Sequence, residues 1–193
     1  SNSLSEPYGC IHSMASGLPK YAEQTYWEKR YQTDVDRPEG STEWYMNWNV
    51  LKPHLFDGGL LGSAALQPPG QVLELGCGHA SLVPGLAEAG FFAIAADFSP
   101  TAIRMASLSS RAGPMEFATL DVRTLPFRSG TFDAVIDKGC FDALKPEDSS
   151  KMLMEACRLL VASGLFLCVS NNETLVRSRA RKMPGWYQAL GTP

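Results

Sequence analysis

The sequence predicts an α/β fold built on a doubly wound, mostly parallel sheet. The first observation behind this prediction is an apolar run, 71–75, that ends in a glycine turn and leads into a helical pattern. The second is the alternation of apolar, strand-length runs with helical patterns farther along the chain. The third is an acidic residue at the end of three successive strands: Glu74, Asp97 and Asp121. Ligands of such sheets bind beyond the carboxyl ends of the strands, so these acids mark the expected site.

Length and composition limit the possible functions. The 193 residues are enough for one domain with a core, and we expect residues 19–193 to form it. The formal net charge of −3 gives no broad basic surface for nucleic acid. No apolar run approaches the roughly 20 residues that a membrane helix needs. Residues 1–18 are polar and are expected to form a disordered leader, in which Met14 is a candidate natural start.

The cysteines and histidines indicate a reducing compartment and no metal site. The five cysteines are an odd number without a Cys-x-x-Cys pair, which is typical of reduced, mostly buried thiols. The three histidines fall in no zinc-ligand spacing. We therefore expect a cytoplasmic protein without a metal ion. The sequence makes no prediction about the oligomeric state.

The glycine turn carries the first functional signal. Gly76 and Gly78 allow the backbone to turn sharply and to approach a ligand closely. The helix expected from Ser81 to Gly90 would offer free N–H groups to a negatively charged ligand group. By themselves, the glycines also fit a turn that binds nothing, although this is the lesser interpretation. Ser81 stands where a dinucleotide fingerprint has its third glycine, which disfavours an NAD-dependent oxidoreductase.

Two aromatic segments precede the first strand. The first, 20–32, is predicted to be a helix in which Trp27 and Tyr31 share a face. The second, which contains Trp44, is predicted to be a helix that opens at residue 41 or 42 and is limited by a proline at 53. The aromatic rings either anchor these helices on the core or close a pocket.

The rest of the chain alternates strands with helices. Ser99 and Pro100 give a strong helix start directly after the second strand. Residues 186–190 are expected to begin a sixth strand before the chain stops. The remaining strands are predicted at 91–96, 115–120, 132–136 and 164–170, and the remaining helices at 101–111, from 146 to about 160, and at 173–183.

Short motifs in this order resemble those of the class I S-adenosylmethionine-dependent methyltransferases. They are Glu74-Leu-Gly-Cys-Gly, Asp97-Phe-Ser-Pro and Asp121-Val-Arg. Further stretches are similar to the methyltransferase-like group that includes the elongation factor 1-alpha lysine methyltransferases: Tyr-Trp-Glu-Lys-Arg-Tyr at 26–31, Glu-Trp-Tyr at 43–45, and Phe-Asp-Ala-Val-Ile-Asp-Lys-Gly-Cys-Phe-Asp-Ala-Leu at 132–144. The Asp-Lys-Gly-x-x-Asp-Ala motif is specific to that neighbourhood, whereas the glycine turn is generic. The resemblance covers about residues 21–190 and implies a Rossmann-like sheet with N-terminal helices over the cofactor.

The resemblance implies S-adenosylmethionine as the cofactor, with S-adenosylhomocysteine as the product. Gly76 and Gly78 would pass beneath the amino-acid half of the cofactor, and Glu74 would support its ammonium group. Asp97 would hold the ribose hydroxyls, and Phe98 would pack on the adenine.

Other positions would complete the cofactor site. Asp121 and the backbone of Val122 would read the adenine edge. Lys138 would line the methionine end, through its backbone. Three aromatic side chains from the N-terminal helices would close over the cofactor: Trp27, Tyr31 and Trp44.

The resemblance further implies methyl transfer to a protein lysine, possible acceptors being translation elongation factors. The sulfonium is a strong methyl donor, so the enzyme mainly supplies alignment and exclusion of water. Aromatic faces suit both a cationic donor and an alkyl-ammonium acceptor. Asp137, together with Asp142, is expected to orient the acceptor amine. Neither needs to be the base, because a water path can carry the proton.

Two other functions stay open at this point. One is a small-molecule methyltransferase, because acceptor identity lies in loops that sequence patterns describe poorly. The other is a catalytically silent binder of the cofactor or of a protein. The sequence departs from the group at Cys140 and Phe141, where a small hydroxyl residue and an aliphatic one are more usual. A class I sheet usually ends with an antiparallel pair of strands, and we expect that pair to be incomplete, with an open sheet edge.

Overall fold

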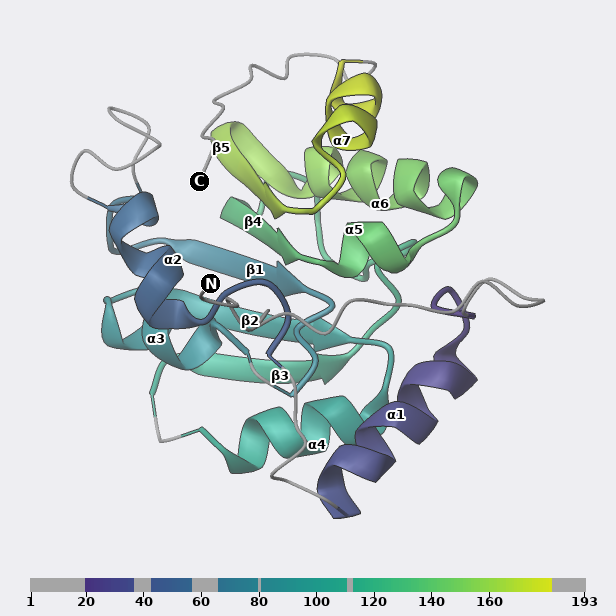
Figure 1. The fold of residues 1–193 in the computed structure, drawn as a ribbon. Helices are drawn as coiled ribbons and strands as arrows, with labels where there is room; N and C mark the ends of the chain where they lie inside the picture. The colour runs from purple at the N-terminus through teal and green to yellow at the C-terminus, as the bar shows by residue number, and fades with distance from the viewer. Residues whose placement is uncertain (1–19, 37–42, 57–65, 80, 111–112, 182–193) are drawn as a thin grey trace, which may run out of the picture.

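Five parallel strands form one sheet in a computed structural model that describes residues 20–36, 43–56, 66–79, 81–110 and 113–181. The strand order within these residues is β3-β2-β1-β4-β5, and helices flank the sheet (Figure 1). The strands are β1 (Gln71–Leu75), β2 (Phe92–Asp97), β3 (Met115–Thr119), β4 (Phe132–Lys138) and β5 (Leu160–Val169). The helices are α1 (Gln24–Asp36), α2 (Trp48–Leu55), α3 (Val83–Glu88), α4 (Pro100–Leu108), α5 (Cys140–Ala143), α6 (Pro146–Leu159) and α7 (Glu173–Ala180). The predicted doubly wound parallel sheet is confirmed.

The order of the strands reverses at β1. The chain first moves from β1 to β2 and β3 on one side, and then returns to add β4 and β5 on the other. Leu75 at the end of β1 is in register with Ala96 in β2 and with Asp137 in β4. Such a reversal leaves a crevice beyond the carboxyl ends of the two inner strands, which is where open α/β sheets bind ligands.

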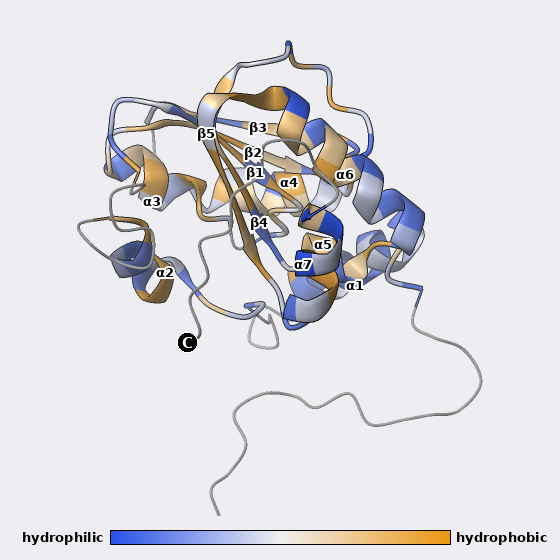
Figure 2. Cartoon of the chain, turned by 90° about the horizontal axis from the view of Figure 1, so that it is seen from above, coloured by the Kyte–Doolittle hydropathy of each residue, from blue (hydrophilic) through white to orange (hydrophobic). Residues whose placement is uncertain are grey.

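Alternate residues of each buried strand face two separate cores. Val72 packs with α2 and α3 on one face of the sheet, whereas Leu73 packs with α6 on the other. The inner strands are buried on both faces, so most of their residues are apolar, and orange predominates on the strands at the centre of Figure 2. A sheet covered on both faces holds its carboxyl edge rigidly, and that edge carries the candidate site.

The second N-terminal helix starts later than predicted. α2 begins at Trp48, and the Asn47 side chain caps it by accepting a hydrogen bond from Val50 N at 3.2 Å. Residues 43–47 are not helical, and Tyr45 has a φ of 62°, which no right-handed helix allows. Pro53 lies inside α2 and does not end it. The Glu-Trp-Tyr segment is therefore irregular, bends at Tyr45 and does not lie on a helix.

Other boundaries differ by a few residues, for identifiable reasons. α1 runs to Asp36 because its buried Asp34 pairs with Arg30 and with His79 in the glycine turn. β5 begins at Leu160, expected on a helix, because that residue pairs with Phe132 of β4. The predicted leader 1–18 and the expected sixth strand 186–190 lie outside the described residues. Within the described ranges, no helix is both long and apolar enough to cross a bilayer.

Candidate functional site

A pocket of about 240 Å³ lies at the carboxyl edge of the sheet. The residues after β2 and β3 line one end of it, which we call the Asp97 end: Asp97, Phe98, Asp121, Val122 and Arg123. The residues after β4 and β5, together with Tyr45, line the other, which we call the Asp142 end: Tyr45, Gly139, Cys140, Phe141, Asp142, Asn171 and Asn172. The pocket therefore brings together most of the residues predicted for the cofactor site.

Aromatic side chains from the N-terminal segments wall the pocket. Trp27 and Tyr31 of α1 stack with ring centroids 5.7 Å apart, and Trp27 and Trp44 pack in a T-shaped arrangement with ring centroids 5.8 Å apart. All three rings line the pocket. α1 reaches this position because Glu28 accepts hydrogen bonds from Ser99 Oγ, at 2.5 Å, and from Thr101 at the start of α4. Electron-rich ring faces of this kind favour a cationic ligand.

Asp97 is the organising carboxylate at its end of the pocket. Its Oδ2 accepts a hydrogen bond from Gly78 N at 3.0 Å, and its Oδ1 accepts one from Ser99 N at 2.9 Å. Burial raises the pKa of Asp97 to about 6, although these amide donors oppose the shift. The two bonds fix the carboxylate between the glycine turn and the first turn of α4. A fixed, buried carboxylate at the end of the second strand has the chemistry needed to bind vicinal hydroxyls.

Glu74 lies beneath the pocket and does not line it. Its Oε2 accepts hydrogen bonds from Ser81 Oγ at 2.6 Å and from Leu82 N at 2.9 Å. Its Oε1 is buried and meets no hydrogen-bond donor among the described residues. Burial raises the pKa of Glu74 to about 7, and the nearby Lys138 opposes this shift. A buried carboxylate oxygen without a donor fits a position that is neutralised by a cationic ligand group.

The two glycines of the turn are required by packing as well as by conformation. Gly76 and Gly78 have φ values of 62° and 57°, in the left-handed region that favours glycine. A Cβ at Gly76 would lie 2.4 Å from Cβ of Cys140, and one at Gly78 would lie 3.0 Å from Oη of Tyr31. Gly76 lines the pocket, whereas Gly78 contributes its N–H to Asp97. The glycine turn therefore packs closely against α5 and α1, and both helices lie close to the pocket.

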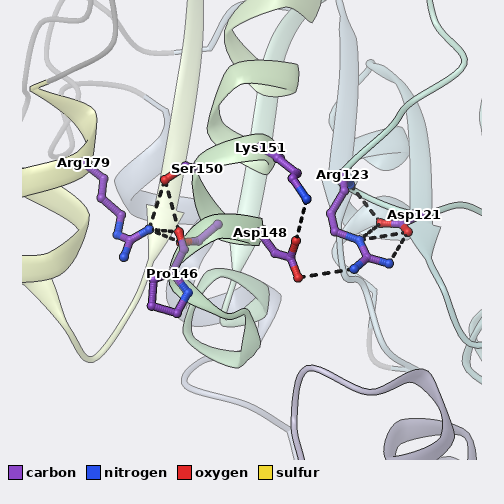
Figure 3. Close-up of polar contacts among 8 residues, drawn as sticks. Asp121, Arg123, Pro146, Asp148, Ser150, Lys151 and Arg179 are labelled. Atoms are coloured by element: carbon purple, nitrogen blue, oxygen red, sulfur yellow. Dashed lines mark hydrogen bonds and ion pairs between the residues drawn. The ribbon is translucent and has the colours of Figure 1, made fainter.

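Asp121 is engaged by a neighbour that the sequence analysis did not single out. The Arg123 guanidinium donates to Asp121 Oδ2 at 2.6 Å and also reaches Asp148 of α6 at 3.3 Å, where Lys151 contributes a further contact (Figure 3). These hydrogen bonds hold the pKa of Asp121 below its usual range. Asp121 still lines the pocket beside Val122, but its charge is already balanced by Arg123.

Lys138 enters the site through its side chain and not only through its backbone. Its Nζ donates to Glu43 Oε1 at 2.5 Å and to the carbonyl oxygen of Trp44 at 3.2 Å. The Lys138 side chain is only 5% exposed. This ion pair ties the Glu-Trp-Tyr segment to the end of β4, which holds the Trp44 ring at the pocket.

The two predicted catalytic carboxylates lie in different surroundings. Asp137 is fully buried and does not line the pocket; its Oδ1 accepts from Phe141 N at 3.1 Å, and Cys168 Sγ approaches its Oδ2 at 2.9 Å. Burial raises the pKa of Asp137 to about 7. Asp142 does line the pocket. The geometry therefore gives Asp137 a positioning role for α5 and leaves Asp142 in reach of a substrate.

Sequence reasoning missed some of the pocket residues. Tyr45 lies next to the predicted Trp44, and its hydroxyl donates to Asp142 Oδ2 at 2.7 Å. Asn171 and Asn172 follow β5 after Ser170, so they carry the same signal, polar residues near a strand end, that identified the acids. Tyr45 gave no such signal, because its place in the pocket depends on a contact with a residue 97 positions away.

Comparisons with known proteins find methyltransferases. Residues 72–164 match a family described as a methyltransferase domain. EEF1A lysine methyltransferase 4 of Bos taurus is 28% identical over 183 residues, which cover 86% of this chain and 68% of that protein. The eEF1A lysine and N-terminal methyltransferase of Danio rerio is 30% identical over 164 residues, but these cover only 22% of that much longer protein. The chain spans 62% of the Mus musculus EEF1A lysine methyltransferase 4.

Solved structures share the fold. A TehB-like S-adenosylmethionine-dependent methyltransferase from Corynebacterium glutamicum superposes with a TM-score of 0.56 at 15% identity, covering 82% of this chain and 81% of that one. The Burkholderia thailandensis 1,6-didemethyltoxoflavin-N1-methyltransferase, which holds S-adenosylhomocysteine, gives 0.58 at 18% identity, covering 81% and 75%. This chain has the domain and the fold of the S-adenosylmethionine-dependent methyltransferases. The methyltransferase resemblance that the sequence motifs carry is thereby confirmed.

The residues of this methyltransferase fit its cofactor. The Asp97 carboxylate suits hydroxyl groups, the buried charge of Glu74 beneath the pocket suits a nearby ammonium group, and the aromatic wall suits a sulfonium. S-adenosylmethionine, when bound, supplies an electrophilic methyl group. The chain itself supplies the cradle that orients the cofactor and the rings that exclude water.

Proposed function

We propose that this methyltransferase transfers a methyl group to the side chain of a protein lysine. The observation that carries the proposal is the pocket itself, in which an aromatic wall faces a pocket-lining carboxylate, Asp142, at the end opposite Asp97. An alkyl-ammonium group is attracted by both, because ring faces and carboxylates each favour a cation. The relatives named for lysine methylation support the same acceptor class.

Elongation factor 1-alpha is the acceptor that we propose first. The relatives are named for this acceptor, and their similarity extends over 79–86% of the chain. We propose that the reaction takes place in the cytoplasm, where this acceptor would be encountered. A small-molecule acceptor has no specific observation in its favour, because the solved small-molecule methyltransferase shares only the fold.

The individual site roles belong to this proposal. Asp97 holds the ribose hydroxyls, Phe98 packs on the adenine, and Asp121 with Val122 lines the adenine edge. Glu74 balances the ammonium group from below. Asp137 positions α5, and Asp142 meets the acceptor amine. Lys138 keeps the Glu-Trp-Tyr segment in place through its pair with Glu43.

Incubation of recombinant elongation factor 1-alpha with the protein and labelled S-adenosylmethionine tests the proposal directly. We expect mass spectrometry to find new methyl groups on lysine, and on lysine only. Asp97→Asn, which weakens the cofactor site, serves as the inactive control. Cofactor binding without methylation of this acceptor would contradict the assignment of elongation factor 1-alpha, and turnover of small amines alone would contradict a protein acceptor.

A further inference from the structure

Two motifs far apart in the sequence interlock at the Asp142 end of the pocket. Tyr45 lies against the turn after β4, and a Cβ at Gly139 would come within 2.7 Å of Cε2 of Tyr45. Gly139 has a φ of 87°, so this position requires glycine both for its conformation and for the space that the ring occupies. Lys138 fastens the two residues before Tyr45 to the same turn. The ring of Tyr45 is therefore held from both sides.

Tyr45 holds this position in a strained backbone conformation. Its φ of 62° lies in the left-handed region, which is unfavourable for a bulky side chain. Such residues persist where surrounding contacts over-determine them, and they gather at functional sites. The strain directs the phenol into the pocket and toward Asp142, where its hydroxyl donates to Oδ2 at 2.7 Å.

The hydrogen bonds between Tyr45 and Asp142 leave this pair of side chains with acceptor capacity and with no donor of their own. Asp142 Oδ1 accepts from Ser170 Oγ at 2.6 Å, and Asp142 Oδ2 accepts from Tyr45 Oη and from Asn171 N. A carboxylate offers about four acceptor sites, so these contacts leave one of them, on Oδ1. Tyr45 Oη donates its proton to Asp142 and accepts from the Asn171 backbone N–H, which leaves one of its two lone pairs. Burial and the Asp142 carboxylate raise the pKa of Tyr45, which keeps the phenol neutral.

We propose that Tyr45 Oη and Asp142 Oδ1 form the site that receives the acceptor amine, with Tyr45 as the residue that orients it. The inference rests on the proposed lysine methylation. Two acceptors beside each other match the two N–H groups of a neutral primary amine. With both N–H groups donated, the nitrogen lone pair points away from Tyr45 and Asp142. The site therefore prefers a primary amine over one that already carries methyl groups.

The chemistry of transfer explains why this orientation matters. The acceptor ammonium first gives up one proton to water, which frees the nitrogen lone pair. A nitrogen–carbon bond then forms as the sulfur–carbon bond of the sulfonium breaks, and the electron pair of the broken bond stays on sulfur. The methylated nitrogen carries the positive charge beside Asp142. Tyr45 contributes alignment of the lone pair and takes no proton.

Binding of small lysine analogues tests the amine site without requiring turnover or a known protein acceptor. The enzyme is loaded with S-adenosylhomocysteine, and Nα-acetyl-lysine methylamide is compared with its Nε,Nε-dimethyl form by tryptophan fluorescence or NMR titration. The protonated primary amine offers three N–H donors and the dimethyl form one. We expect the wild-type protein to bind the primary amine about 5-fold more tightly, and Tyr45→Phe to bind both forms about equally.

Controls separate this role from a structural one. Tyr45→Phe keeps the ring over Gly139, so its affinity for S-adenosylhomocysteine should stay within about 2-fold of wild type. Tyr26→Phe makes the same chemical change outside the pocket lining and should keep the preference for the primary amine. Equal binding of both analogues by wild type, or an unchanged preference in Tyr45→Phe, would overturn the inference. If the wild-type protein prefers the primary amine and Tyr45→Phe loses that preference, but elongation factor 1-alpha is not methylated, only the choice of protein acceptor is contradicted.

Discussion

The Asp97 end of the pocket rests on neighbouring strands, whereas the Asp142 end is assembled from three segments that are distant in the sequence. Asp97 bonds to the turn after the adjacent strand and to its own following helix. Asp142 instead meets Tyr45 from the N-terminal region and Ser170 from beyond β5. The Asp97 end is therefore a local element of neighbouring strands and turns. The Asp142 end forms only when the folded chain brings distant segments together.

The difference has a functional consequence. The Asp97 end depends on backbone amides that are fixed by the sheet and by helix starts, so it varies little when loops change. The Asp142 end depends on side chains carried by a strained segment and by the turn after β4. We infer that the first end binds the cofactor common to all such enzymes and that the second end adapts the chain to its acceptor.

The largest loss of cofactor affinity is expected from a substitution that disrupts only the Asp97 end. Asp97→Ala removes the acceptor of two backbone amides and of the proposed ribose contacts, so affinity for S-adenosylhomocysteine should fall by about 100-fold or more. Asp133→Ala is the matched control. The Asp133 carboxylate also accepts a hydrogen bond from a backbone N–H, that of Gln71 at 2.7 Å, but it lies at the opposite edge of the sheet. Calorimetric titration should show unchanged affinity for the control. Equal losses in both variants would mean that Asp97 acts only through stability.

Glu74→Gln should separate cofactor affinity from stability. Burial raises the pKa of Glu74 to about 7 in the folded chain, whereas an exposed glutamate has a pKa near about 4.3. The folded state therefore binds the proton more tightly, and the free energy of unfolding falls as the pH rises between these two values. At pH 8 the neutral glutamine should stabilise the fold by on the order of 1–3 kcal/mol.

The same substitution should weaken cofactor binding by about 10-fold, because the ammonium group loses its counter-charge. Thermal unfolding at about pH 5 and pH 8, together with titration of S-adenosylhomocysteine, checks both parts. The stability gain should appear at the higher pH and shrink at the lower one. A variant that is destabilised at pH 8 would show that the Glu74 charge is well balanced within the chain.

Lys138→Met tests how the two ends are connected. The substitution removes the partner of Glu43 and of the Trp44 carbonyl, so the Glu-Trp-Tyr segment should lose its anchor. Glu43 is about a third exposed, and we expect a loss of about 1–2 kcal/mol of stability together with about a 5-fold loss in cofactor affinity, through Trp44. A double-mutant cycle with Glu43→Gln measures the coupling. Additive effects would show that the pair does not hold the segment.

The smallest effect is expected at Arg123. Its guanidinium binds Asp121 and Asp148 at a site where its side chain is 40% exposed, and exposed pairs contribute about 1 kcal/mol or less. Arg123→Gln should therefore change affinity for S-adenosylhomocysteine by no more than about 3-fold. Raising the salt concentration should reduce even this difference. A loss as large as that of Asp97→Ala would place Arg123 among the residues that bind the cofactor.

Most of the fold and half of the site were predictable from sequence for the same physical reason. A buried parallel strand, its glycine turn and its capped helix are local patterns, so Glu74, Asp97 and Asp121 were found at the ends of the first three strands. The position of Tyr45 was not predictable, because a left-handed backbone at an aromatic residue arises from contacts with Gly139 and Asp142. The same contacts pull residues 43–47 out of the helix that their composition predicts.

Thermal unfolding with and without S-adenosylhomocysteine tests the central claim most directly, because it asks whether the Asp97 end binds the cofactor independently of the Asp142 end. A ligand at about 100 times its Kd adds roughly 2.7 kcal/mol, which is about 5–10 °C in Tm for a chain of this size. We expect this shift for the wild-type protein and for Tyr45→Phe, and almost none for Asp97→Ala. No shift in the wild-type protein, or a shift that Tyr45→Phe abolishes, would contradict the account.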